Sequence, residues 1–270
     1  MMFTDPPYNV DYKGGTKEGL SIQNDKMSSA NFYQFLYAAF TAAASVVKPG
    51  GGAYVCHSDR ESISFRKSLI DSGWQVKNCL IWVKNHFVLG RMDYHLRHEP
   101  ILYGWRDGAG HKWYGGRKND SVIEEMAGIS IDSNEGFTEI SLSDGLCSVV
   151  IRVPSYEVVS GSNGQDTTIW KVNKPLRNLE HPTIKPVEIP ARAIRNSSKN
   201  GDKVLDLFLG SGTTVIACEQ EGRVCYGLEL DEKYCDVIIR RWQSFSGRAA
   251  TLNGDGRNFA EVSAARSACN

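Results

Sequence analysis

The sequence predicts an α/β protein, in which a parallel sheet has helices on both faces and carries a small inserted β-rich segment. Between residues 182 and 245, strand and helix patterns alternate, as is typical of parallel sheets covered by helices. Residues 119–170 differ, because short β-type runs are separated there by the turn sequences SNEG, SDG and GSNG. With 270 residues, of which 41% are hydrophobic, the chain is long enough to bury the core of one large domain.

The first half of the chain contains two expected helices among expected strands. Residues 28–48 place apolar side chains on one helical face, and the sequence PGGG ends this helix. Ser58 and Glu61 have the spacing of a capping box, which would open a second helix to about Asp71. The runs GAYVCH, WQVKNCLIWVK and HEPILYGW are predicted strands. The loop over 9–27, with GGTKEG at its centre, is long enough to be functional.

The second half resumes the alternation after the inserted segment. The runs ISID, FTEISLS, CSVVIRV and YEVVS predict hairpins in the insert. KPVEIPARAIRNSS then predicts a helix with an early proline, KVLDLF a buried strand, residues 211–221 a helix and VCYGLEL another strand. Asp231 is expected to cap a final helix to about Phe245. We expect the polar tail from Ser246 to be loosely attached.

Charge is unevenly distributed along a chain whose formal net charge is zero. Residues 60–118 contain 11 Lys and Arg against 5 Asp and Glu, whereas residues 119–170 contain 1 against 9. This segregation suits a protein with one anion-facing side, although solvated faces also segregate charge. Apolar runs are too short to cross a membrane and the N-terminus lacks the build of a signal peptide, so a cytoplasmic location is expected. The seven cysteines contain no C-x-x-C pair, which argues against a metal site or a disulfide framework.

The stretch FTDPPYNVDY, at residues 3–12, combines an acid, two prolines and an aromatic ring. Consecutive prolines fix φ, remove two amide donors and push Asp5 towards extended geometry. Pro6 and Pro7 therefore form a stiff elbow that holds a carboxylate and the ring of Tyr8 in set positions. Taken alone, the stretch is more typical of a turn that ends a strand.

The stretch VLDLFLGSGTT, at residues 204–214, leads from a buried strand through a glycine turn into a helix. Open α/β sheets bind ligands at such a strand end, where glycines allow close approach and the helix offers unpaired amides. Glu229 ends the next strand 23 residues after Asp206, close to the separation at which such folds bind a ribose. An acid before the glycines favours a cationic nucleoside such as S-adenosylmethionine over a pyrophosphate. A structural βαβ unit without a ligand is the alternative interpretation.

Three motifs in this order resemble those of the β class of amino-directed (N6-adenine or N4-cytosine) DNA methyltransferases: TDPPY, HPTIKP and DLFLGSGTT. HEPILYGW and GLELDEKY are also similar to segments of phage and bacterial members. The resemblance covers nearly the whole chain apart from the β-rich segment, and implies a permuted Rossmann-like sheet. It divides the chain into a catalytic half (1–104), a target-recognition region with the insert (105–178), a cofactor-binding half (179–246) and a polar tail (247–270).

The resemblance implies a role for each motif. Asp5 and the carbonyl of Pro6 would accept hydrogen bonds from the exocyclic amino group of a base flipped out of duplex DNA, and Tyr8 would stack on that base. The transfer is a direct displacement, so positioning and electrostatics suffice, without a metal or a covalent nucleophile. S-adenosylmethionine is the implied cofactor. The residues expected around it are Asp206, Phe208, Gly210, Gly212, Thr213 and Glu229, completed by Thr183, Lys185 and Pro186 unless these form an ordinary helix-opening loop.

The basic stretch 84–118 is the expected DNA contact. It interleaves cationic with aromatic side chains, a mixture that suits phosphate contacts and stacking, although half of the aromatics suit the core equally well. The acidic insert would repel DNA, so we expect it to point away from DNA or to contact protein. A homodimer is plausible from the family alone. The cationic residues expected on DNA are Lys84, Arg91, Arg97, Arg106, Lys112 and Arg117.

The implied activity is methyl transfer to adenine N6, because Asp at the first motif position favours adenine in the family. N4-cytosine enzymes use the same four residues, DPPY, and remain the second choice. Methylation of RNA or of a protein glutamine would more often use Asn in place of Asp5. Only Met1–Thr4 precede Asp5, where family members have a full strand and a further Gly-Asp motif. An incomplete central strand is therefore expected, with Gly254-Asp255 as a weak substitute, and a truncated, inactive homologue that binds DNA or a partner is a further alternative.

Overall fold

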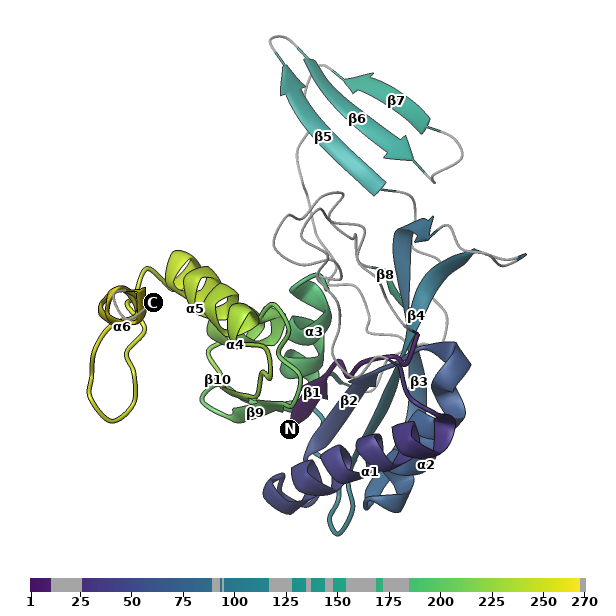
Figure 1. The fold of residues 1–270 in the computed structure, drawn as a ribbon. Coiled ribbons are helices and arrows are strands. Elements are labelled where there is room, and N and C mark those ends of the chain that lie inside the picture. Colours follow the sequence, from purple (N-terminus) through teal and green to yellow (C-terminus); the bar gives the residue numbers. More distant parts are fainter. Residues whose placement is uncertain are drawn as a thin grey trace.

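The computed structural model describes residues 1–10, 26–88, 93, 95–116, 128–134, 137–143, 148–153, 169–171 and 185–267. A seven-stranded sheet forms the centre of the protein, in the order β10-β9-β1-β2-β4-β3-β8 (Figure 1). Its strands are β1 (Met2–Thr4), β2 (Gly52–Cys56), β3 (Trp74–Val88), β4 (Leu96–Arg106), β8 (Ile169–Lys171), β9 (Lys203–Asp206) and β10 (Val224–Gly227).

The sheet is mixed rather than purely parallel. β1 pairs in parallel with both β2 and β9, and β10 pairs in parallel with β9. The parallel pairing predicted from residues 182–245 is confirmed by β9 and β10, whereas β4 runs antiparallel to both of its neighbours, β2 and β3. β1 has three residues and lies between β9 and β2. Because β4 runs in the opposite direction to β1 and β2, the first residues of β4 lie at the same edge of the sheet as the last residues of β1.

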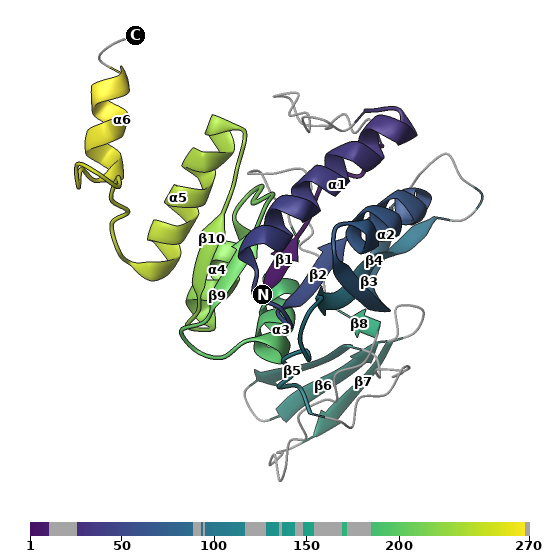
Figure 2. The same cartoon turned by 90° about the horizontal axis from the view of Figure 1, so that it is seen from below.

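Helices cover both faces of this sheet, as expected (Figures 1 and 2). One face carries α1 (Ser29–Val46) and α2 (Ser62–Asp71). The other carries α3 (Glu188–Ser197), α4 (Thr213–Gln220) and α5 (Glu232–Ser246). None of the helices within the described residues is long and apolar enough to cross a membrane.

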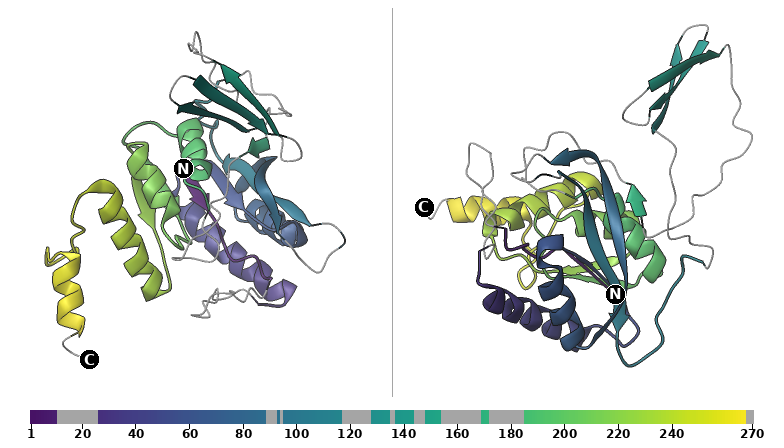
Figure 3. Two further views of the ribbon diagram at one scale, coloured as in Figure 1. Left: turned by 90° about the horizontal axis from the view of Figure 1, so that it is seen from above. Right: turned by 90° about the vertical axis from the view of Figure 1, so that its right-hand side faces the viewer.

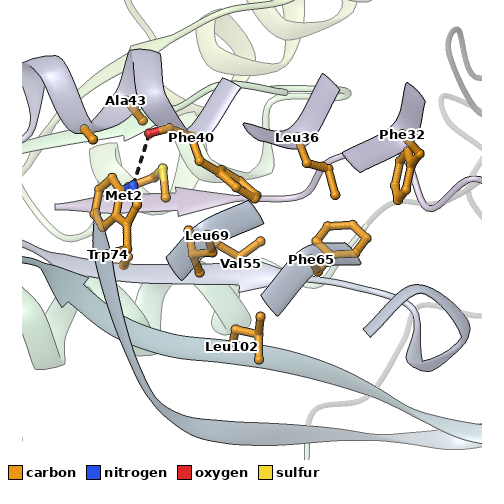
Figure 4. Close-up of a cluster of buried hydrophobic side chains, with 12 residues drawn as sticks. Met2, Phe32, Leu36, Phe40, Ala43, Val55, Phe65, Leu69, Trp74 and Leu102 are labelled. Atoms are coloured by element: carbon orange, nitrogen blue, oxygen red, sulfur yellow. Dashed lines mark hydrogen bonds between the residues drawn. The ribbon is translucent and has the colours of Figure 1, made fainter. Parts of the chain in front are cut away.

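The core beneath α1 and α2 follows from the helical spacing of apolar residues (Figure 4). Phe32, Leu36 and Phe40 are spaced by one turn along α1 and are fully buried against the sheet. The indole of Trp74 donates a hydrogen bond of 3.0 Å to the carbonyl of Phe40 and so joins β3 to α1. Ser28 caps α1 by accepting a hydrogen bond from the amide of Asn31. This packing gives β1 and β2 a rigid support.

Three expectations for individual elements change in the structure. Among the described residues Ser58 makes no side-chain capping bond, and a 3-10 turn (Asp59–Glu61) precedes α2, so the capping-box prediction is wrong. A helix in the polar tail, α6 (Phe259–Ser267), was not predicted from the sequence, and Arg240 of α5 lies 5.3 Å from the ring of Phe259. The candidate Gly-Asp substitute lies in the turn before α6, where Asp255 binds Arg257.

The inserted β-rich segment forms a sheet of its own. β5 (Gly128–Asn134), β6 (Phe137–Ser143) and β7 (Ser148–Val153) pair antiparallel, as the hairpin prediction required. This three-stranded sheet stands apart from the seven-stranded one (Figure 3). The predicted strand YEVVS and most of the GGTKEG loop lie outside the described residues. β8 pairs in parallel with β3 and returns the chain to the main sheet.

Candidate active site

The motifs TDPPY and DLFLGSGTT come together at one edge of the main sheet. β1 and β9 are parallel neighbours, so Asp5 follows the end of β1 close to where Asp206 ends β9. Because β4 runs in the opposite direction, Glu99 near its beginning lies at this same edge, opposite Trp82 of β3. Lys185 reaches the edge from the segment that leads into α3.

Asp5 is held by hydrogen bonds to both of its carboxylate oxygens. The Tyr8 hydroxyl donates to Oδ1 over 2.8 Å, and the Lys185 ammonium donates to Oδ2 over 2.6 Å. Lys185 Nζ also donates to the Tyr8 hydroxyl over 3.0 Å. The Tyr8 ring packs edge-on against Phe65, which belongs to the core beneath α1 and α2. The elbow predicted from the two prolines is thus a fixed arrangement of an acid and a phenol.

Glu99 completes a cluster of two carboxylates and two ammonium groups. Its carboxylate lies 2.5 Å from Lys84 Nζ and 3.2 Å from Lys185 Nζ. Burial alone would raise the pKa of Glu99, but the two lysines outweigh it and lower the pKa to about 2. Burial would lower the pKa of Lys185, and the charges of Asp5 and Glu99 raise it instead. Burial and the same two acids raise the pKa of Tyr8, which keeps its phenol protonated.

Two lysines lie in places that differ from the sequence-based expectation. Lys185 was expected at the cofactor, yet its ammonium binds Asp5 and Glu99. Lys84 was expected on DNA phosphates, yet it is buried and paired with Glu99. Sequence reasoning missed Glu99 as a site residue. An acid at the start of the otherwise apolar strand HEPILYGW was the available signal, because a buried carboxylate needs a cationic partner.

Asp206 is buried at the end of β9 and accepts three hydrogen bonds. The Thr4 hydroxyl donates to it over 2.9 Å, the Thr214 hydroxyl over 2.6 Å and the amide of Phe208 over 3.1 Å. Burial raises its pKa to about 7. Asp206 therefore joins β1, the glycine turn and α4.

The glycine turn itself is closed by Glu229, whose carboxylate accepts hydrogen bonds from the amides of Gly210 and Asp231 over 2.7 and 2.9 Å. Gly210 and Gly212 both have positive φ, and Gly212 begins α4. The Thr213 hydroxyl donates to the carbonyl of Lys185 over 3.3 Å, which connects this turn to the cluster of Asp5, Glu99 and the two lysines. The expected residues Phe208, Thr213 and Pro186 thus lie at the same edge, and Thr183 lies outside the described residues.

Among the residues that the structure describes, the cationic side chains expected on DNA do not form one surface. Arg97 is exposed near the beginning of β4, at the edge that carries Asp5. Arg106 ends β4 at the opposite edge, where its guanidinium donates to the carbonyls of Ala44 and Gly73. The amide of Lys112 bonds to Gly50 at that opposite edge. Arg91 and Arg117 lie outside the described residues.

Within the part of the chain that the structure describes, no three His, Cys, Asp or Glu side chains are grouped to hold a metal ion. The chemistry available at this edge is that of a fixed hydrogen-bond acceptor, Asp5, beside a glycine turn with two further acids. A family model described as DNA methylase, of the N6/N4 methyltransferase type, matches residues 1–240. The chain belongs to this DNA methylase family. S-adenosylmethionine is accordingly the methyl donor.

Individual relatives of this methylase support the assignment. The type II methyltransferase M2.DpnII of Streptococcus pneumoniae is 25% identical over 251 residues, which cover 90% of this chain and 82% of that protein. The crystal structure of an M1.HpyAVI–SAM complex has a TM-score of 0.52 and 21% identity, covering 89% of this chain and 86% of its own. PvuII DNA methyltransferase, which is cytosine-N4-specific, has a TM-score of 0.60 and 12% identity. The match covers 94% of this chain and 80% of the PvuII chain. The structural neighbours establish the α/β methyltransferase fold.

Proposed function

We propose that this methylase transfers a methyl group from S-adenosylmethionine to the N6 amino group of adenine at specific sites in duplex DNA, in a restriction-modification setting. The observation that carries the proposal is the double hydrogen bond that holds the Asp5 carboxylate, next to the glycine turn of β9. Asp at this motif position favours adenine, as the resemblance implies.

In the proposed mechanism, the target base is extruded from the duplex because its amino nitrogen is inaccessible in the stack. Asp5 and the carbonyl of Pro6 accept the two amino hydrogens, and this direction of the hydrogen bonds fixes where the nitrogen lone pair points. Pro7 keeps the elbow rigid, and Tyr8 supports the base. S-adenosylmethionine supplies an electrophilic methyl group on a sulfonium. As the nitrogen–carbon bond formed, the sulfur–methyl bond of the donor would break and leave a neutral thioether, and the Asp5 carboxylate would be placed to accept the surplus proton of the methylated amine.

The residues around the glycine turn fit a cationic nucleoside. Two carboxyl groups, from Asp206 and Glu229, lie on either side of a turn whose positive-φ glycines carry no side chain. We assign the methionine end of the donor to the side of Asp206, Gly210 and Gly212, and the ribose to Glu229. Phe208 is half-buried beside the turn and offers an apolar face.

The experiment is nucleoside mass spectrometry of unmethylated duplex DNA after incubation with the protein and S-adenosylmethionine. We expect N6-methyladenine from the wild type and none from Asp5→Ala, because the acceptor of the amino group is lost. Calorimetric titration of both proteins with S-adenosylmethionine accompanies the assay. A wild type that binds the donor and methylates no base would contradict the proposed activity, and one that fails to bind it would favour the inactive homologue.

N4-methylation of cytosine is the second candidate, and the fold similarity to the cytosine-specific PvuII enzyme favours it. Cytosine also presents an exocyclic amino group next to a ring acceptor. The same assay separates the two bases, since N4-methylcytosine in place of N6-methyladenine would keep the mechanism and change the target.

A further inference from the structure

Lys185 binds Asp5 and Tyr8, which the proposed function places at the target base. It also pairs with Glu99, to which the proposed function gives no role. We propose that Lys185 is a positioning residue of the methyl transfer, held by Glu99 and Lys84, and that its side chain serves the target amine rather than the cofactor. This inference rests on the proposed function. It assigns roles to Glu99 and Lys84 as supports of Lys185, and neither support touches the base.

The geometry of Lys185 is that of a tripod. An ammonium has three N–H donors, and Nζ lies 2.6 Å from Asp5 Oδ2, 3.0 Å from the Tyr8 hydroxyl and 3.2 Å from Glu99 Oε2. The Tyr8 hydroxyl accepts from Lys185 and donates to Asp5 Oδ1 over 2.8 Å, which is closer than the competing acceptor Glu99 Oε2 at 3.3 Å. A closed triangle of hydrogen bonds thus fixes the Asp5 carboxylate relative to the Tyr8 ring. These are the two groups that must orient the target amine.

Glu99 and Lys84 keep the tripod in place. Lys84 Nζ lies 2.5 Å from Glu99 Oε1, so each oxygen of this carboxylate has its own ammonium partner. Both lysines lie near the Trp82 ring, at 5.3 and 6.0 Å from its centroid. The four charges cancel in a nearly buried cluster, and loss of any one charge leaves another uncompensated. Glu99 therefore acts on Asp5 through Lys185.

The two ends of Lys185 face different partners. Its carbonyl accepts the Thr213 hydroxyl at the start of α4, whereas its ammonium binds Asp5 and Tyr8. A change that shortens or neutralises the side chain leaves the carbonyl contact with the glycine-turn region intact. We therefore expect the side chain to affect the rate of methyl transfer and to leave the affinity for S-adenosylmethionine unchanged.

The test compares Glu99→Gln and Lys185→Met with Glu221→Gln as matched control. Glu221 is also a carboxylate paired with a cation, at 2.7 Å from Arg195, at the far end of α4. We expect kcat to fall about a hundredfold in Glu99→Gln and Lys185→Met, because a small misplacement of a reacting group has this effect. The dissociation constant of S-adenosylmethionine should stay within about threefold of wild type, the pattern of an interaction used in the transition state.

A double variant adds the decisive comparison. If Glu99 acts through Lys185, Glu99→Gln adds less than about twofold to the loss in Lys185→Met, whereas independent sites would multiply their effects. Near-UV circular dichroism of each variant verifies that the fold is retained, and Glu99→Gln, which preserves shape, serves should Lys185→Met not fold. An active wild type whose Glu99→Gln variant keeps full kcat would overturn the inference.

Titration with S-adenosylmethionine measures the affinity for the donor and does not depend on methyl transfer. A Lys185→Met or Lys185→Arg protein that folds but loses S-adenosylmethionine affinity would place the side chain at the cofactor and overturn the inference, whether or not the wild type methylates DNA. Absence of methylated nucleosides with the wild type contradicts the proposed function instead, so the two failures are distinguishable.

Discussion

The hydroxyl of Thr4 donates a hydrogen bond of 2.9 Å to the buried carboxyl group of Asp206, across 202 residues of sequence. Thr4 also accepts a hydrogen bond from the amide of Leu207 over 3.3 Å. The Thr4 side chain at the end of β1 therefore holds the first residue of the glycine motif and the start of its turn. The proposed target site and the proposed cofactor site are mechanically linked at this point.

Thr4→Val preserves the shape of the side chain and removes this link. Asp206 and Leu207 each lose a buried partner, so we expect the free energy of unfolding to fall by about 1–3 kcal/mol. S-adenosylmethionine affinity should fall as well, because the turn loses its anchor. Urea titration and calorimetry measure the two effects. Thr41→Val, at an exposed position of α1, is the control and should change neither; equal stability of both variants would contradict the prediction.

The buried carboxyl group of Asp206 predicts how stability varies with pH. Its pKa is raised to about 7 in the folded protein, from 3.8 when exposed, so between these values the folded state binds more protons than the unfolded state. This contribution to stability is complete below about pH 4 and is lost as the pH rises through 7, by about 4 kcal/mol. Asp206→Asn removes the titration. Denaturation at several pH values gives the free energy of unfolding of wild type and of Asp206→Asn. The difference between the two should change by about 4 kcal/mol between pH 4 and pH 7, and a constant difference would refute the assignment.

Gly212 and Gly247 allow a matched pair of glycine substitutions. Both have left-handed backbones, with φ of +81° and +68°. A Cβ at Gly212 would lie 3.0 Å from Ile238, whereas at Gly247 it would meet no described atom within 4 Å. We expect Gly247→Ala to cost about 1–2 kcal/mol of stability for the backbone alone. Gly212→Ala should cost more and should weaken S-adenosylmethionine binding, which Gly247→Ala should leave unchanged.

Arg106 and Arg97 should have different roles despite their proximity in the sequence. Arg106 donates to the carbonyls of Ala44 and Gly73 at 3.0 Å, away from Asp5, so Arg106→Ala should destabilise the fold by about 1–3 kcal/mol. The Arg106→Ala variant should bind DNA with the same salt dependence as the wild type. Arg97→Ala should lower the slope of log affinity against log salt by about one, because a phosphate contact is lost. The reverse pattern would move the DNA surface to the opposite edge.

The sequence predicted the described helices other than α6, most strands and the separate β-rich sheet because each has a local signal. The one-turn spacing of Phe32, Leu36 and Phe40 and the cap at Asp231 are properties of neighbouring residues. The antiparallel direction of β4 has no such signal, because an apolar strand of this length pairs either way. The capping box failed because Glu61 accepts bonds from Asn9 and Ser64 instead, partners supplied by the tertiary fold and the adjoining turn.

The same distinction explains the candidate site. Asp5, the glycine turn and Glu229 stand in recognisable motifs, and the fold brings them to one edge. Lys84 was assigned from the basic stretch and Lys185 from its motif, and neither signal specifies whether a lysine meets phosphate, cofactor or carboxylate. Which anion it meets depends on the reversal of β4, which brings Glu99 to Asp5.

The position of β1 determines when the site exists during synthesis. Met2 pairs with Leu205, and the Asp5 carboxylate depends on Lys185, so residues made early must wait for residues made late. At about 5–20 residues per second, roughly ten to forty seconds of translation separate these partners. A nascent or prematurely terminated chain lacks the ammonium that holds its acceptor and the strand that carries its glycine turn. We therefore expect chains that end before the glycine turn to lack methyltransferase activity.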